Sequence, residues 1–154
     1  TTVIIRFSPM SEGLKTATIS IVNNDWDENP YDIALYGTGV MGPMRIAKVE
    51  REGVVCLKID GRLDAKTASE AETTVKEVLR EGRLHLLFDL SGMDYISSAG
   101  LRVILMTVKE LRSKKGKVAL CALTPYVKEI FDVSNFSSII PITDTVETGL
   151  QQMR

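Results

Sequence analysis

The chain has 154 residues, of which 44% are hydrophobic and 25% are charged, and its 19 Lys and Arg nearly balance its 20 Asp and Glu. This length and composition indicate one globular domain, with room for a fragment of a second. No apolar run approaches the about 18 residues needed to cross a bilayer, and a near-neutral charge without a basic stretch argues against a nucleic-acid partner. The N-terminal residues lack the pattern of a signal peptide, so we expect a cytoplasmic protein without membrane contact.

Residues 1–40 predict a short all-β segment of about three strands. Hydrophobic residues alternate with other residues within residues 3–7, 16–21 and 31–35, which is the period of half-buried strands. Residues 23–30 carry the Asn, Asp and Pro of a turn, and residues 37–39 (GTG) predict a hinge at the end of the segment. Such a segment buries too little surface to be stable alone.

From about Met44 the pattern changes to strands that alternate with helices. Alternation of this kind predicts an α/β fold with a mainly parallel sheet, an antiparallel edge hairpin and about four helices. The predicted strands are residues 45–48 and 54–59, joined by a hairpin turn at 51–53, and 84–90, 118–123 and 138–142. The predicted helices are residues 66–80, 101–115 (capped by Gly116), a short one from Pro125, and a terminal one from Thr143.

Residue types that carry out catalysis or bind metals are sparse in this chain. Cys56 and Cys121 are its only cysteines and stand far apart in apolar runs, so we expect buried thiols rather than a disulfide or a zinc site. His85, the sole histidine, begins an apolar strand and is expected to have a structural or surface role rather than a catalytic one. Asp89 and Asp94 flank a Gly turn, which favours a solvated or turn-capping role over metal binding. We therefore expect no catalytic residue, no metal and no cofactor, and hence no enzymatic activity.

The most informative segment lies between the strand at 84–90 and the helix that follows it. Ser98 directly precedes a strongly periodic helix, so its best local role is that of N-cap. A helix start presents unpaired N–H groups and a positive dipole end, and Ala99 and Gly100 carry no side chain that blocks access. The positive end of the helix dipole would stabilise a phosphate on Ser98 by about 0.3–1 kcal/mol. The added negative charge would also change which partner surfaces can bind at this helix start.

Three stretches of the second part resemble a known family: residues 61–64 (GRLD), 89–96 (DLSGMDYI) and 97–101 (SSAGL). With them, residues 44 to about 152 resemble a STAS domain, the fold of bacterial anti-sigma factor antagonists. In that family a kinase-type anti-sigma factor phosphorylates a serine at this loop–helix junction. The unphosphorylated protein captures the kinase and frees the sigma factor, and a PP2C-type phosphatase resets the switch.

The resemblance implies roles for individual residues. Ser98 matches the phosphoacceptor, and Ser97 stands where the family often has Asp, which leaves Ser97 as an alternative acceptor. The expected partners are an anti-sigma factor serine kinase of the GHKL type and a PP2C-type phosphatase. Asp64 lies in a loop that the family places beside the acceptor, where it either contacts the partner or caps the next helix. The residues assigned to partner binding are Asp64, Asp94, Ser97, Ala99, Gly100 and Arg102.

Residues 1–40 carry a second resemblance, to the last strands of immunoglobulin-like repeats of the abnormal-spindle/Hydin type. The matching residues are 7–9, 13, 15–21, 23–25, 29–31 and 35–39. The front half of such a domain is missing, which leaves three alternatives. These strands belong to a longer protein, they complete a sheet elsewhere, as in a homodimer, or they are appended to a native start at Met41 or Met44. We expect two parts: a partial immunoglobulin-like segment at 1–40 and a STAS domain at 41–154.

Two other functional classes remain open. The first is a phosphoryl-accepting receiver with Asp89 as acceptor, which is disfavoured because the last predicted strand ends without the expected lysine. The second is a constitutive STAS docking or scaffold module of a larger, surface-associated protein, which the N-terminal resemblance favours.

Overall fold

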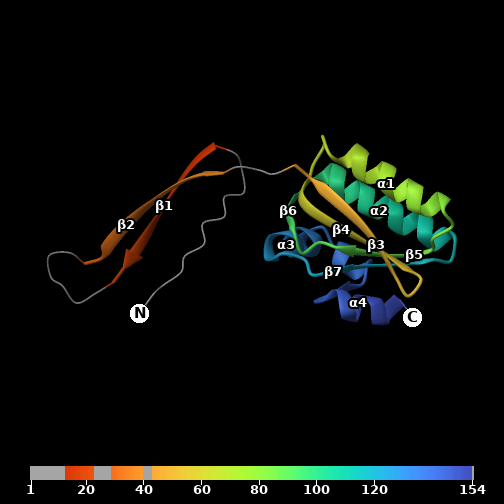
Figure 1. The fold of residues 1–154 in the computed structure, drawn as a ribbon. Coiled ribbons are helices and arrows are strands. Elements are labelled where there is room, and N and C mark those ends of the chain that lie inside the picture. The colour runs from red at the N-terminus through yellow and green to blue at the C-terminus, as the bar shows by residue number, and fades with distance from the viewer. Residues whose placement is uncertain (1–12, 23–28, 40–42, 154) are drawn as a thin grey trace. The chain divides into compact units, whose positions relative to one another are not determined.

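The computed structural model describes residues 13–22, 29–39 and 43–153, and the chain divides into two compact units, Thr1–Met41 and Gly42–Arg154. The first unit contains an antiparallel pair of strands, β1 (Gly13–Ile21) and β2 (Tyr31–Gly39) (Figure 1). Ile19 pairs with Ile33, and both side chains are half-buried, as the alternating pattern predicts. The strand predicted at residues 3–7 lies outside the described residues.

The hinge predicted at residues 37–39 is wrong. These residues continue β2, because each of them pairs with a residue at the start of β1 in the antiparallel register. Glycine weakens a strand but does not end it where a neighbouring strand supplies the ladder of hydrogen bonds.

The second unit is a mixed α/β domain, and its parallel sheet, edge hairpin and four α-helices confirm the predicted fold class. The sheet order is β3-β4-β5-β7-β8, with β6 paired to β4, and only the β3–β4 pair is antiparallel. The strands are β3 (Arg45–Arg51), β4 (Val54–Leu63), β5 (His85–Asp89), β6 (Met93–Ile96), β7 (Lys117–Cys121) and β8 (Ile142–Thr143). The helices are α1 (Ala68–Arg80), α2 (Ser98–Ser113), α3 (Pro125–Val133), the 3₁₀ turn η1 (Phe136–Ser138) and α4 (Val146–Met153).

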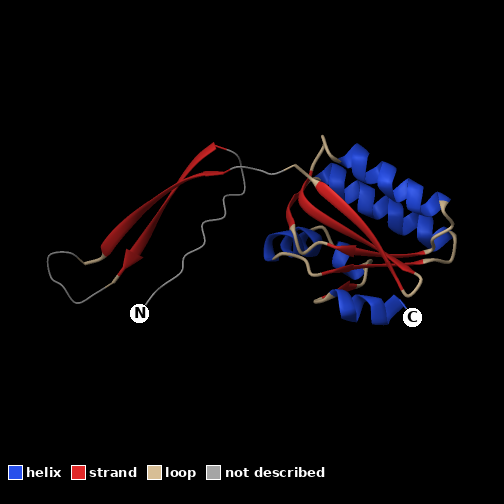
Figure 2. Cartoon of the chain, viewed as in Figure 1, coloured by secondary structure: helices blue, strands red, loops and turns tan. Residues whose placement is uncertain are grey.

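The sheet is covered by helices on both faces. Figures 1 and 2 show α1 and α2 side by side over one face and α4 on the other. The larger apolar cluster joins α1 and α2 to the sheet through fully buried residues such as Leu57, Phe88 and Ile104. A smaller cluster packs Met153 of α4 against Leu87 and its neighbours. Burial on both faces explains why β5 is continuously apolar from Leu86 to Phe88.

Several predicted elements differ from the structure in their extent. Strand β6 was not predicted, because four residues with Asp94 among them give no clear strand pattern. The strand predicted at 138–142 is reduced to β8, and the last helix begins at Val146 rather than at Thr143. Gly116 is not the left-handed residue that ends α2, since Lys115 takes that conformation with φ 58°. Gly116 is instead required by space, because a Cβ there would lie 2.3 Å from the Leu84 carbonyl oxygen.

Both cysteines are buried free thiols on the face of the sheet that α4 covers. Burial, reinforced by the Asp89 carboxylate, raises the pKa of Cys121 to about 12. Burial and the same carboxylate also raise the pKa of Cys56. Because the thiolate is the reactive form, we expect neither cysteine to be alkylated by iodoacetamide at pH 8 in the native protein, whereas both react in urea. Mass spectrometry of the labelled chain checks this, and rapid native labelling of either residue would contradict it.

Candidate functional site

The candidate site lies where β4 and β6 end and α1 and α2 begin. The two strands are parallel neighbours, with Leu63 paired to Ile96, so the segments that follow them emerge at the same edge of the sheet. The Ser97 N–H donates to the Leu63 carbonyl at 3.0 Å and extends this pairing by one residue. The sheet therefore places the Asp64 loop beside the start of α2. Within the described part of the chain, no helix is long and apolar enough to span a membrane.

Ser97, not Ser98, is the N-cap of α2, which corrects the sequence prediction. Ser97 has the extended conformation of a cap (φ −98°, ψ 174°), because it still follows the direction of β6. Its Oγ accepts from the Gly100 N–H at 3.4 Å, and it is half-buried. Ser98 is the first residue of the helix, and its side chain is exposed. The two adjacent serines thus have different roles, one capping the helix and the other facing solvent.

Gly100 holds the start of α2 against β4. It is buried, and a Cβ at this position would lie 2.5 Å from the Leu63 carbonyl oxygen and 2.9 Å from Cγ1 of Ile96. The helix can approach the strand this closely only because residue 100 has no side chain. The exposed Ser98 therefore sits on a helix start whose position is fixed by packing.

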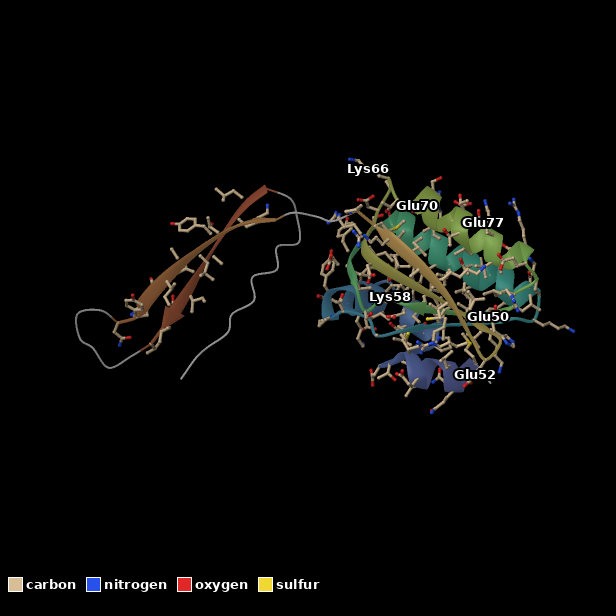
Figure 3. All side chains as sticks on the ribbon, in the orientation of Figure 1. Glu50, Glu52, Lys58, Lys66, Glu70 and Glu77 are labelled. Carbon is tan, nitrogen blue, oxygen red and sulfur yellow. The ribbon has the colours of Figure 1, made fainter. Side chains whose placement is uncertain are left out.

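Asp64 organises the loop that precedes α1. Its Oδ1 accepts from the backbone N–H of Lys66 at 2.9 Å and of Thr67 at 3.3 Å. The helix N-cap is Thr67, whose hydroxyl donates to the Arg62 carbonyl at 2.8 Å, and α1 begins at Ala68. Asp64 thus caps the turn before the helix rather than the helix itself. Figure 3 shows Lys66 at this end of the domain and Glu52 at the opposite end, in the β3–β4 turn.

A stack of three side chains, which we call the Arg62 stack (Arg62, Tyr95 and Tyr126), adjoins this loop. The Arg62 guanidinium carbon lies 3.9 Å from the centroid of the Tyr95 ring, and Arg62 Nε lies 3.5 Å from Asp64 Oδ2. The Tyr95 and Tyr126 rings are stacked with their centroids 6.3 Å apart. The Thr124 hydroxyl donates to the Met93 carbonyl at 3.1 Å and fixes the start of α3 against β6.

Comparison with known proteins settles the family. Residues 45–149, more than half of the chain, match the model of the STAS domain. The chain belongs to the STAS family. BtrV of Bordetella bronchiseptica, named as an anti-sigma factor antagonist, is 35% identical over 106 residues, which are 69% of this chain and 91% of BtrV.

Solved structures agree with this STAS fold. A Thermotoga maritima protein described as an anti-sigma factor antagonist matches with a TM-score of 0.66 and 26% identity, over 71% of this chain and 94% of that chain. The Bacillus cell fate determinant SpoIIAA, solved in the phosphorylated form, matches with a TM-score of 0.58 and 18% identity, over 73% of this chain and 100% of that chain. At that identity SpoIIAA supports the fold alone.

The STAS fold brings most of the predicted site residues to one edge. Asp64 and Ser97 flank the point where β4 and β6 end, and Ser98 and Ala99 form the first turn of α2. The others lie near it: Asp94 is exposed on β6, Gly100 is buried in the contact with β4, and Arg102 is exposed one turn along α2. Asp89, the receiver-type alternative, is buried at the end of β5, where its carboxylate accepts from the Ser91 N–H at 3.0 Å.

The sequence prediction did not include the Arg62 stack or Thr67. Arg62 lies within the GRLD stretch and Tyr95 within DLSGMDYI, so both lay inside the quoted motifs without being assigned a role. Tyr126 is more than 30 residues further along the chain, and only the packing of α3 against β6 brings it to the stack.

The Asp64 carboxylate should contribute to stability at neutral pH and lose that contribution in acid. The N–H of Lys66, followed by that of Thr67 and by the Arg62 guanidinium, lowers the pKa of this carboxyl. A pKa that is lower in the folded than in the unfolded protein stabilises the fold above about pH 4, and the effect disappears as the pH falls through the folded value. We expect Asp64→Asn to be less stable than wild type in urea at pH 7, and the difference to shrink at about pH 3. An equal difference in the free energy of unfolding between wild type and Asp64→Asn at both pH values would contradict the stabilising role of the Asp64 carboxylate.

Proposed function

We propose that this STAS protein is an anti-sigma factor antagonist, a binding switch without catalysis of its own that acts in the cytoplasm. In its unphosphorylated form it captures a kinase-type anti-sigma factor of the GHKL class. Phosphorylation of Ser98 ends the capture, and a PP2C-type phosphatase restores it. The observation that carries this proposal is the exposed hydroxyl-bearing Ser98 at the first position of a helix whose start is fixed against the sheet.

Ser98 is a better candidate acceptor than Ser97. A kinase must place the hydroxyl next to the γ-phosphate of ATP, so an exposed side chain is favoured over a half-buried one. The Ser97 oxygen also accepts the Gly100 N–H, and its modification would remove that cap.

The partner would contact the exposed and half-buried residues around Ser98. Asp64, Ser97, Ala99 and Arg102 surround Ser98, with Asp94 nearby on β6, whereas the buried Gly100 contributes by packing. A phosphate brings about −1.5 to −2 charges to this surface without requiring the domain to unfold. In the complex this charge would repel acidic groups of the partner, and burying it in the interface would cost desolvation energy. Both effects weaken binding and release the partner.

Phosphopeptide mapping of the protein isolated from its own host tests the proposal. The peptide to follow covers residues 84–102. Phosphate on Ser98 would support the switch, and the Ser98→Ala form could then capture the kinase for identification. Phosphate on Ser97 would support a phosphorylation switch but would assign the acceptor to Ser97 instead of Ser98. A loop that stays unmodified under all growth conditions would favour the constitutive docking module.

Residues 1–40 are proposed to be the last strands of an immunoglobulin-like unit that pairs with a second copy of the chain. Within the described residues, Ile19 and Ile33 lie side by side and only half-buried in a two-stranded sheet, and such a sheet is marginal in water by itself. We expect the 154-residue chain to be a dimer by light scattering and Ile19→Lys to shift it to monomer. If the wild-type chain is a monomer, the proposal that residues 1–40 pair with a second copy is wrong.

A further inference from the structure

Ser98 and Arg102 form a pair one turn apart on the exposed side of α2. Residues four apart in a helix lie on the same face with their Cβ atoms about 6 Å from each other. Side chains in a helix also lean toward its N-terminus, so a long side chain at position 102 covers the turn that contains Ser98. Both residues are exposed, so neither is held away from the other by packing.

Arg102 has no strong partner in the unphosphorylated protein. In the described part of the chain, no carboxylate lies within salt-bridge distance of its guanidinium. The Glu72 carboxylate of α1 interacts electrostatically with Arg102, but that carboxylate already forms a salt bridge with Lys76. The first turn of α2 contains no acidic residue. Arg102 is therefore available to a negative charge that appears at Ser98.

We propose that Arg102 binds the phosphate of phosphorylated Ser98 within the same helix, so that modification removes both a hydroxyl and a cation from the partner surface. The inference rests on the proposed function, since it assumes that Ser98 carries the phosphate. Arg102 then acts in both states: it contacts the anti-sigma factor when Ser98 is unmodified, and it holds the phosphate when Ser98 is modified. A phosphate engaged by a planar guanidinium accepts two parallel N–H bonds, which a lysine ammonium cannot supply.

This pairing also explains how a local modification can have a large effect on binding. A charged phosphate alone would repel only acidic groups of the partner. When Arg102 binds the phosphate, an acidic group of the partner loses its ion pair with Arg102. The same acidic group is also repelled by the new phosphate. The rigid start of α2, held by the Gly100 contact with Leu63, keeps Ser98 and Arg102 in register in both states.

The test installs phosphoserine at position 98 of the full chain during synthesis, so it needs neither kinase nor partner. The second pKa of the phosphate, ordinarily about 6, is measured by ³¹P NMR titration at low salt in wild type, Arg102→Gln and Lys109→Gln. Lys109→Gln is the matched control, because it removes one exposed cation of the same helix about two turns further on. We expect Arg102→Gln to raise this pKa by about 0.3 unit, and Lys109→Gln to leave it close to wild type.

Arg62→Gln serves as a second comparison, because Arg62 is another cation at this edge of the sheet. Equal phosphate pKa values in wild type and Arg102→Gln would overturn the inference, as would a larger shift in Arg62→Gln than in Arg102→Gln. The readout is independent of the switch itself. If the phosphorylated chain still bound the anti-sigma factor, the proposed function would fail while the titration would still decide whether Arg102 holds the phosphate.

Discussion

Replacing Gly100 with alanine should lower the free energy of unfolding by about 2 kcal/mol, although alanine is ordinarily favoured over glycine in a helix by about 1 kcal/mol. The reason is the contact with β4. The new Cβ would lie 2.5 Å from the Leu63 carbonyl oxygen and 2.8 Å from Leu63 Cγ, and the carbonyl belongs to a paired strand that cannot yield easily. The start of α2 would have to move outward, and Ser98 would move with it. Urea unfolding followed by circular dichroism measures the loss.

Ser69→Ala is the matched control for this prediction. Ser69 is exposed in the first turn of α1, where a change to alanine meets no neighbouring strand. We expect its stability to stay within about 0.5 kcal/mol of wild type. A Gly100→Ala protein as stable as wild type would show that α2 does not depend on the close approach to Leu63.

Ser98→Asp should bind the anti-sigma factor at least about 100-fold more weakly than wild type, whereas Ser98→Ala should bind within about threefold. Alanine removes only a hydroxyl that faces solvent in the free protein. Aspartate adds a negative charge at the centre of the proposed interface, and an unpaired charge buried by a partner costs several kcal/mol. Titration calorimetry with the kinase that the Ser98→Ala form captures measures the dissociation constants of both variants.

Ser113→Asp provides the control for charge alone. Ser113 is exposed at the opposite end of α2, so the same change in net charge there should leave the affinity close to wild type. Equal binding by the Ser98→Asp and Ser98→Ala forms would contradict the switch.

The periodic elements of this protein could be predicted from the sequence because their burial repeats with the period of the backbone. The helix stripe that includes Ile104, Val108 and Leu111 is buried as expected, and the continuous apolar run in β5 is covered on both faces. Strand β6 could not be predicted in this way, because it is short and its pairing with β4 includes a register shift near Arg62.

The candidate site was predicted in outline, but its finer geometry depends on contacts between distant parts of the chain. The local sequence favours Ser98 as the cap, whereas the pairing of Ser97 with Leu63 places the helix boundary between Ser97 and Ser98. The tight contact at Gly100 and the stacking of Tyr126 on Tyr95 likewise arise from tertiary packing. No pattern in the neighbouring sequence encodes these distances.

The most direct test of the switch is a reversible measurement on a single sample. The chain carrying phosphate on Ser98 is titrated with its anti-sigma factor, treated with a PP2C-type phosphatase, and titrated again after the phosphatase is removed. We predict weak or undetectable binding before treatment and recovery of the affinity of the unphosphorylated chain after it. Affinity that is the same before and after removal of the phosphate would contradict the account.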